Sequence, residues 1–272
     1  MGGLRLGLIP RGDEGDDRER EFVGSLSIAL RTEVDVHHAA DYRVVLAGIE
    51  QGLVSFAWLP PLVAARATRQ RLVDPIAVAV RHGTTAYTTV LVTRPDSPIH
   101  SIADLRNVRV AWVDRESASG YAVLRSALAR AGVRLTDAFS SEVFVRSHAA
   151  VARAVLDGKV DVGATCAHAD AGDMRFARSP YAGDAGLTSA ELRPVFEAGP
   201  IPSDLFAVRR DLPLRVRSAL ESALLHAIPP RVIAAARALM HADGFTVPTP
   251  EHRRMLDALV DTGSWYPSAP GA

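Results

Sequence analysis

The sequence predicts an α/β fold made of two lobes, and three features carry this prediction. Short apolar runs alternate with segments of helical periodicity, a pattern typical of α/β folds with largely parallel sheets. This pattern restarts after Thr93, and a break at Gly199–Pro202 precedes a last strand and two more helices. With 272 residues, 48% of them hydrophobic, the chain can bury a large core. We therefore expect one lobe from residues 1–93 with 204–272, and a second from residues 94–203.

In the first lobe, strands are expected at residues 4–10, 32–37, 54–58, 75–80 and 87–93, and helices at 22–31 and 41–52. Asp41 is a suitable cap for the second helix, and Gly52 ends it. Pro60 and Pro61 start another helix, because proline suits the first helical position.

In the second lobe, strands are expected at residues 108–113, 143–145, 160–165 and 192–197, and helices at 101–105, from the serine-rich loop onward, and at 148–156. A strand at 206–209 and helices at 214–228 and 231–241 follow, and the last residues, rich in proline, should fray. Because the chain crosses between the lobes twice, we expect a hinge of two strands and a ligand cleft between the lobes.

Composition excludes several classes of protein. Basic and acidic residues number 31 each, which gives no support for nucleic-acid binding. The single cysteine, Cys166, excludes an intrachain disulfide. No apolar run reaches the roughly 18 residues that a membrane-spanning helix needs. The first residues do not resemble a secretory signal, so we expect a cytoplasmic protein, or an extracytoplasmic one if a signal peptide has been removed.

The most informative stretch is the loop between the strand at residues 108–113 and the following helix. It contains Ser117, Ser119 and Gly120. Hydroxyl groups and free backbone amides at a helix start meet the positive end of the helix dipole, which suits a phosphate, phosphonate, sulfonate or carboxylate. A second interpretation is that one of the serines only caps the helix.

A second group of reactive side chains is Cys166-Ala-His168-Ala-Asp170. Its residue types are those of a metal site or of a thiol nucleophile, but we favour a loop that lines the cleft. Ser117 or Ser119 with His148 and Asp204 has the composition of a hydrolytic triad, although no Gly-x-Ser-x-Gly elbow is present. Lys159, the only lysine, lies in an expected turn, which disfavours a pyridoxal-phosphate Schiff base. We expect no cofactor and no metal.

Seven motifs, in order, resemble the phosphate, phosphite and phosphonate solute-binding (PhnD-like) components of ABC importers, within the type 2 periplasmic binding proteins. They are Asp41-Tyr42; Gly52-x-Val54 with Ala57-Trp58-Leu59-x-Pro61; Tyr87–Pro98 with Ile102–Leu105; Val110–Asp114 with Ser117–Tyr121; Ser147-His148; Gly158–Ala164; and Pro200–Asp204. The resemblance covers most of the chain. It implies two α/β lobes with central mixed sheets, joined by a two-strand hinge.

The resemblance also assigns roles to residues. It implies that the Ser117 and Ser119 hydroxyls and the Gly120 and Tyr121 amides hold ligand oxygens. By the same resemblance Tyr42, Tyr87, His148 and Asp204 point into the cleft, with Asp204 receiving a ligand ammonium or a protonated oxygen. Without the resemblance, His148 is as readily a helix cap and the two tyrosines are packing residues. Trp58, Cys166 and His168 are further candidates to line the cleft.

Two departures from the family pattern concern the ligand. Ala118 stands where the family usually has a hydroxyl residue, which removes one donor, and Pro60 stands where glycine is common. The leading hypothesis is a non-catalytic protein that binds a small phosphorus oxyanion, closes around it and delivers it to an ABC permease. The alternatives are a repurposed enzyme or accessory protein of a biosynthetic pathway, and a sensory domain.

Overall fold

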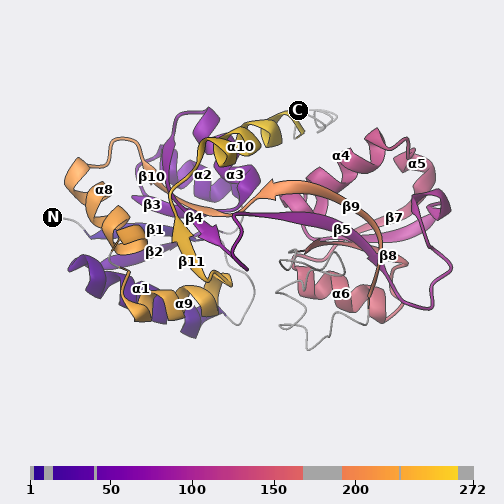
Figure 1. Cartoon of the computed structure of the whole chain (residues 1–272), viewed down its shortest axis with the longest axis horizontal. Helices are drawn as coiled ribbons and strands as arrows, with labels where there is room; N and C mark the ends of the chain where they lie inside the picture. Colours follow the sequence, from indigo (N-terminus) through magenta and orange to yellow (C-terminus); the bar gives the residue numbers. More distant parts are fainter. Residues whose placement is uncertain (1–2, 9–14, 40–41, 168–191, 227, 263–272) are drawn as a thin grey trace. The chain divides into compact units, whose positions relative to one another are not determined.

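The computed structural model describes residues 3–8, 15–39, 42–167, 192–226 and 228–262 (Figure 1). The chain divides into unit 1, Met1–Thr85 with Pro202–Asp257, and unit 2, Ala86–Ile201 with Ala258–Ala272. The sequence placed the first boundary after Thr93. The strand β5 (Ala86–Thr93) instead belongs to unit 2, because it pairs through Thr88–Thr93 with β8 (Val162–Ala167) of that unit.

Unit 1 is built on a six-stranded mixed sheet. Its strands in spatial order are β11 (Gly244–Thr246), β4 (Val73–Val80), β10 (Leu205–Arg209), β3 (Phe56–Leu59), β1 (Leu4–Leu8) and β2 (Val34–His38). The strand β1 is parallel to β2 and β3, whereas β10 is antiparallel to β3 and β4. Since β10 lies between two strands from the first part of the chain, the sheet joins two distant segments of sequence.

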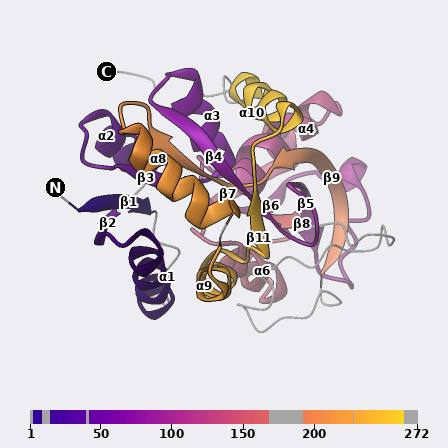
Figure 2. The same cartoon turned by 60° about the vertical axis from the view of Figure 1, so that its left-hand side comes forward.

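Helices cover both faces of this sheet. Figure 2 shows α1 (Gly15–Leu30) and α9 (Pro230–Met240) side by side on one face, where α8 (Leu214–Glu221) and the turn η4 (Ser222–His226) also pack. The other face carries α2 (Tyr42–Glu50) and α3 (Pro61–Arg69), and α10 (Pro250–Thr262) ends the described chain. Phe206 is at the centre of the core, with its ring 5.9 Å from Phe22 and 4.8 Å from Trp58.

Unit 2 is built on a five-stranded mixed sheet in the order β7 (Phe139–Phe144), β6 (Val108–Trp112), β8, β5 and β9 (Arg193–Pro202). The strand β6 is parallel to β7 and β8, and β5 is antiparallel to β8. Alternate residues of β6 face opposite ways. Val110 and Trp112 pack with residues of α4 (Val123–Arg130), while Ala111 packs with α6 (His148–Leu156). Two short helices, η1 (Ile102–Asp104) and α5 (Leu135–Ala138), complete the described part.

The structure confirms the α/β class with two mixed sheets, and it corrects several details. The expectation of largely parallel sheets was wrong, because β10, β11 and β5 run antiparallel to their neighbours. The first helix begins at Gly15 rather than Phe22, since its exposed charged residues are compatible with a helix surface. The elements α5, β11 and α10 were not predicted from the sequence. The frayed terminus that we expected lies outside the described residues.

No single helix of the described residues is long and apolar enough to cross a membrane. The bent pair Leu214–His226 and Pro230–Met240 passes the test of length and composition when both helices are taken together. In unit 1, however, Leu224, Val232, Ala236 and Met240 of this pair lie in the hydrophobic core.

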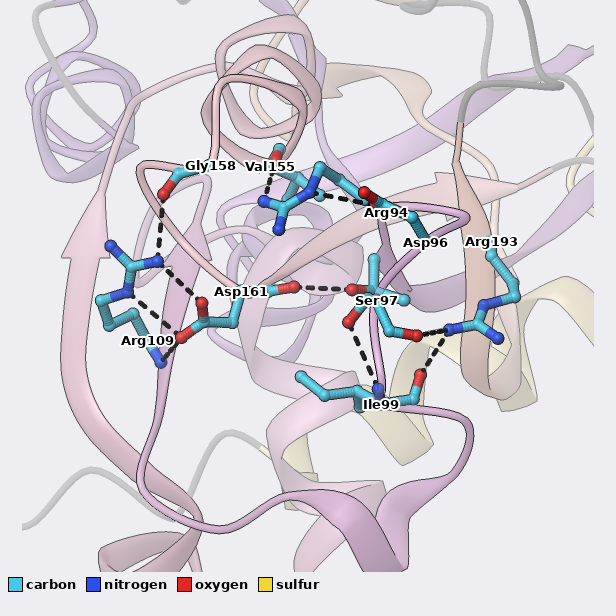
Figure 3. A network of polar contacts seen from close by, with 10 residues as sticks. Arg94, Asp96, Ser97, Ile99, Arg109, Val155, Gly158, Asp161 and Arg193 are labelled. Atoms are coloured by element: carbon cyan, nitrogen blue, oxygen red, sulfur yellow. Dashed lines mark hydrogen bonds and ion pairs between the residues drawn. The ribbon is translucent and has the colours of Figure 1, made fainter.

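A network of hydrogen bonds joins neighbouring strands of unit 2 at the end of the sheet where β6 and β8 begin (Figure 3). The Arg109 guanidinium donates to Asp161 Oδ1 at 2.7 Å and to Gly158 O at 3.0 Å, and the Arg109 amide donates to Asp161 Oδ2 at 2.8 Å. The Thr93 hydroxyl donates to Asp161 O at 2.7 Å. These contacts join β5, β6 and the turn before β8 at one end of the sheet.

Asp161 should make the stability of unit 2 depend on pH. Hydrogen bonds from Arg109 lower the pKa of Asp161 below its ordinary value of 3.8, against an opposing effect of burial. A lowered folded-state pKa contributes stability above the unfolded-state pKa, and this is lost as the pH falls through the folded-state value. We therefore expect the free energy of unfolding of Asp161→Asn to fall below that of the wild type at about pH 7, with the difference shrinking at about pH 3. Urea unfolding at both pH values tests this, and a constant difference would contradict it.

Candidate functional site

The loop after β6 is a compact turn that leads directly into a helix. Asp114 organises it, since its carbonyl oxygen accepts from the Ser117 amide at 3.0 Å and its Oδ1 accepts from the Glu116 amide at 2.9 Å. The chain then enters the π-helical turn η2 (Ala118–Ala122), which continues into α4. The helix therefore begins at the carboxyl end of a buried parallel strand, where α/β sheets place their ligand sites.

Ser117 is the N-cap of this helix. Its hydroxyl oxygen accepts from the Gly120 amide at 3.0 Å, which confirms the capping interpretation for this serine. A hydroxyl that accepts one hydrogen bond still has its own hydrogen to donate. The Gly120 amide, in contrast, is engaged by Ser117, so its contact with a ligand stays a prediction. The earlier amides of the turn, those of Ala118 and Ser119, are the ones that a helix start leaves without intrahelical carbonyls.

Gly120 is required by a close approach of two backbone segments. A Cβ atom at this position would lie 2.4 Å from Val113 Cγ2 and 2.5 Å from Val113 Cβ. The same contact brings the Val113 amide to the Gly120 carbonyl oxygen at 3.1 Å. The glycine therefore lets the turn fold back onto the end of β6.

Two threonines on neighbouring strands lie behind the turn, and the sequence did not reveal either of them. The Thr89 hydroxyl of β5 donates to Ser119 O at 2.6 Å and lies 3.3 Å from Thr165 O of β8. The Thr165 hydroxyl lies 3.1 Å from His148 Nδ1. Both threonines are buried. Threonine is common in strands for its β-branched shape, so neither residue gives a signal of its own in the sequence.

His148 is the first residue of α6 rather than its cap. Ser147 takes the capping role, and its hydroxyl oxygen accepts from the Ala150 amide at 3.1 Å. The His148 ring is therefore not needed to cap the start of the helix, and its Nδ1 lies against the Thr165 hydroxyl instead. The structure thus brings Ser117, Ser119 and Gly120 into one turn and links His148 to it through Thr165 and Thr89.

The tyrosines have different surroundings. The Tyr121 ring packs 5.3 Å from Trp112 and 5.3 Å from Phe144, so its side chain belongs to the core of unit 2 and its amide alone lies in the turn. Tyr87 is partly buried on β5. Tyr42 is the first residue of α2 in unit 1, and its side chain is outside the described part. The predicted ligand contacts of Tyr42 and Tyr87 stay predictions.

Asp204 lies in unit 1 and forms an ion pair that the sequence did not reveal. Arg81 Nη2 donates to Asp204 Oδ2 at 2.7 Å and to Met240 O at 2.8 Å, and both charged side chains are buried. The Arg81 guanidinium also lies 6.0 Å from the centre of the Trp58 ring. The charge of the carboxylate that we expected to receive a ligand ammonium is therefore balanced within the protein.

The buried His252 contacts the residue that precedes Asp204 in the chain. His252 Nε2 donates to Ser203 O at 3.2 Å, next to Asp204. Burial lowers the pKa of His252, so the ring favours its neutral form.

Of the three residues proposed to line the cleft, two lie in the described part of the chain. Trp58 packs against Phe206 and Phe245 and is 4% exposed, which gives its ring a packing role in unit 1. Cys166 is buried on β8 opposite Thr89 of β5. His168 and Asp170 lie outside the described residues. Among the residues that the structure does describe, no three His, Cys, Asp or Glu side chains are placed to hold a metal ion.

A family model described as ABC transporter, phosphonate, periplasmic substrate-binding protein matches residues 6–253. Among solved structures, a binding protein component of an ABC phosphonate transporter from Pseudomonas aeruginosa has a TM-score of 0.76 at 20% identity, covering 99% of this chain and 90% of its own. PhnD1 from Prochlorococcus marinus, in complex with methylphosphonate, has a TM-score of 0.74 at 19% identity, covering 94% and 96%. A Xanthomonas citri protein bound to ATP has a TM-score of 0.75 at 24% identity, covering 96% of both chains. At identities of 19–24%, these TM-scores show that the chain shares its fold with the three proteins.

Proposed function

Since the chain belongs to the family of periplasmic substrate-binding proteins of phosphonate ABC transporters, we propose that the Ser117–Tyr121 turn of unit 2 binds the phosphorus oxyanion of its ligand. The family makes the protein a solute-binding component and does not favour the alternative of an enzyme or accessory protein of biosynthesis. We further propose that the protein delivers its bound ligand to an ABC permease.

The observation that supports the proposed site is that the Ser117–Tyr121 turn places hydroxyl and amide donors together at a helix start. Ser117 and Ser119 supply hydroxyl groups at the start of η2, and the first amides of the helix face the same end of the helix dipole. Hydrogen bonds from neutral donors to a charged oxygen are stronger than those between neutral groups. Ala118 supplies no hydroxyl, so the oxyanion rests on the two serines, on the Ala118, Ser119 and Tyr121 amides, and on His148.

A screen of anions tests this proposal. Phosphate, phosphite, methylphosphonate, 2-aminoethylphosphonate and sulfate are added to the purified chain, and the melting temperature is followed. A ligand that binds only the native state raises the melting temperature by mass action. At a free ligand concentration of 100 times the Kd, it stabilises the native state by about 2.7 kcal/mol. We expect such a rise with at least one phosphorus oxyanion, and methylphosphonate is the first choice because PhnD1 holds it.

Ser119→Ala is the variant that links this rise to the turn. Loss of the hydrogen bond from one hydroxyl to a charged oxygen should weaken binding by about 1.5–3 kcal/mol, which raises the Kd roughly ten- to a hundredfold. The matched control is Ser141→Ala, which removes an exposed serine hydroxyl from β7 of the same sheet. The proposal is wrong if no phosphorus oxyanion shifts the wild type, or if Ser119→Ala responds like the control.

A further inference from the structure

We propose that Thr89 and Thr165 are positioning residues for the oxyanion site, fixing the serine turn and the His148 ring before any ligand arrives. This inference rests on the function proposed above. Neither hydroxyl needs to touch the ligand, because each acts through a group that does. Both threonines come from the strands β5 and β8, which pair with each other, so they form a rigid support for the turn.

Thr89 acts on the peptide that joins Ser119 to Gly120. The Thr89 hydroxyl holds the carbonyl end of this peptide through Ser119 O at 2.6 Å, and Ser117 Oγ holds its amide end through Gly120 N at 3.0 Å. The next peptide is held through Gly120 O by the Val113 amide at 3.1 Å. Two successive peptide planes are therefore fixed by three bonds from three segments of unit 2. A site ordered in this way avoids the entropic cost of ordering the turn upon binding.

Thr165 acts on the histidine. Its hydroxyl lies 3.1 Å from His148 Nδ1, and this contact fixes the orientation of the imidazole ring and therefore the direction of Nε2. The two threonines are connected, since Thr89 Oγ1 also lies 3.3 Å from Thr165 O. The contacts thus run from the serine turn through β5 and β8 to α6, entirely within unit 2.

The choice of threonine at these positions has a chemical reason. Thr89 is 0% exposed and Thr165 is 6% exposed, and their neighbours Val90, Ala164 and Cys166 on the two strands are buried apolar residues. Valine is β-branched like threonine and has almost the same shape, but it has no hydroxyl. A buried hydroxyl is retained without cost only when it is hydrogen-bonded, and here both partners belong to the proposed site.

The experiment measures the Kd for methylphosphonate by calorimetry in single variants. Thr89→Val and Thr165→Val each remove one hydroxyl and keep the shape, and Thr89→Ser and Thr165→Ser restore the hydroxyl. Thr93→Val is the matched control, because Thr93 is also 0% exposed on β5 and also donates to a backbone carbonyl, that of Asp161 at the other end of the strand. Urea unfolding of each variant gives its stability separately from its affinity.

We expect the Kd to rise about three- to tenfold in both valine variants, because each loses one hydrogen bond. In the two serine variants, which keep the hydroxyl, the Kd should stay within about twofold of the wild-type value. Thr93→Val should lower stability and leave the Kd unchanged. If the wild type binds no phosphorus oxyanion, the proposed function fails. If the wild type binds and the two valine variants match Thr93→Val in Kd, the positioning role is refuted while the function stands. Should Thr89→Val not fold, Thr165→Val alone decides between these results.

Discussion

Replacement of Arg81 by leucine is expected to destabilise unit 1 by about 3–5 kcal/mol, the usual cost of removing one partner of a buried ion pair. The Arg81 and Asp204 side chains are 4% and 10% exposed, and their closest atoms are 2.7 Å apart. Leucine would leave the Asp204 carboxylate buried without the guanidinium, and it would also remove the donors to Met240 O. Urea unfolding at neutral pH measures the loss.

Two further variants make this result specific to the buried pair. Arg134→Leu breaks an ion pair with Asp137 whose side chains are 84% and 53% exposed, and we expect a loss of about 0–1 kcal/mol. Adding Asp204→Asn to Arg81→Leu removes the uncompensated charge and should recover part of the stability. An Arg81→Leu protein that is no less stable than Arg134→Leu would contradict a structural role for the pair.

Replacement of Gly120 by alanine is expected to disrupt the oxyanion site. The new Cβ atom would lie 2.4 Å from Val113 Cγ2, a distance that requires the turn or the end of β6 to move. Overpacking of this kind costs about 1–3 kcal/mol of stability. Movement of the turn also displaces the Ser119 hydroxyl and its neighbouring amides, so we expect the Kd for methylphosphonate to rise about tenfold or more.

Gly24→Ala is the control for this change. Gly24 lies within α1, and a Cβ atom there meets nothing within 4 Å, so alanine should stabilise the helix by up to about 1 kcal/mol and leave binding unchanged. A Gly120→Ala protein that binds methylphosphonate as tightly as the wild type would show that the turn tolerates the added methyl group, and would contradict the prediction from the Val113 contact.

The sequence predicted most elements of the fold because their periodicity is local. The helix α6 has the bounds that we expected, His148–Leu156, and β6 differs by one residue at its end. The order and direction of strands were less accessible, since the insertion of β10 between β3 and β4 depends on packing between distant segments. The short strand β11 and the helix α10 were missed, because β11 has three residues and α10 presents a largely polar surface.

The site could be predicted in part for the same reason. Ser117, Ser119 and Gly120 are adjacent in the sequence and precede a helix, so their conjunction was visible. Thr89 contacts Ser119 across 30 residues, Thr165 contacts His148 across 17, and Arg81 contacts Asp204 across 123. Such contacts form only when the sheet brings distant segments together, so the sequence does not identify the partner of a threonine in a strand or of an arginine just after one. The sequence therefore revealed the groups proposed to touch the ligand better than the groups that hold them.

A crystal structure of the chain grown with methylphosphonate tests the central claim most directly. We predict that phosphonate oxygens lie within about 2.7–3.2 Å of the Ser119 hydroxyl and of an amide in the first turn of η2. Thr89 should retain its contact with Ser119 O in that complex, because the site is ordered before binding. A phosphonate group bound elsewhere in the protein, away from the Ser117–Tyr121 turn, would contradict the account.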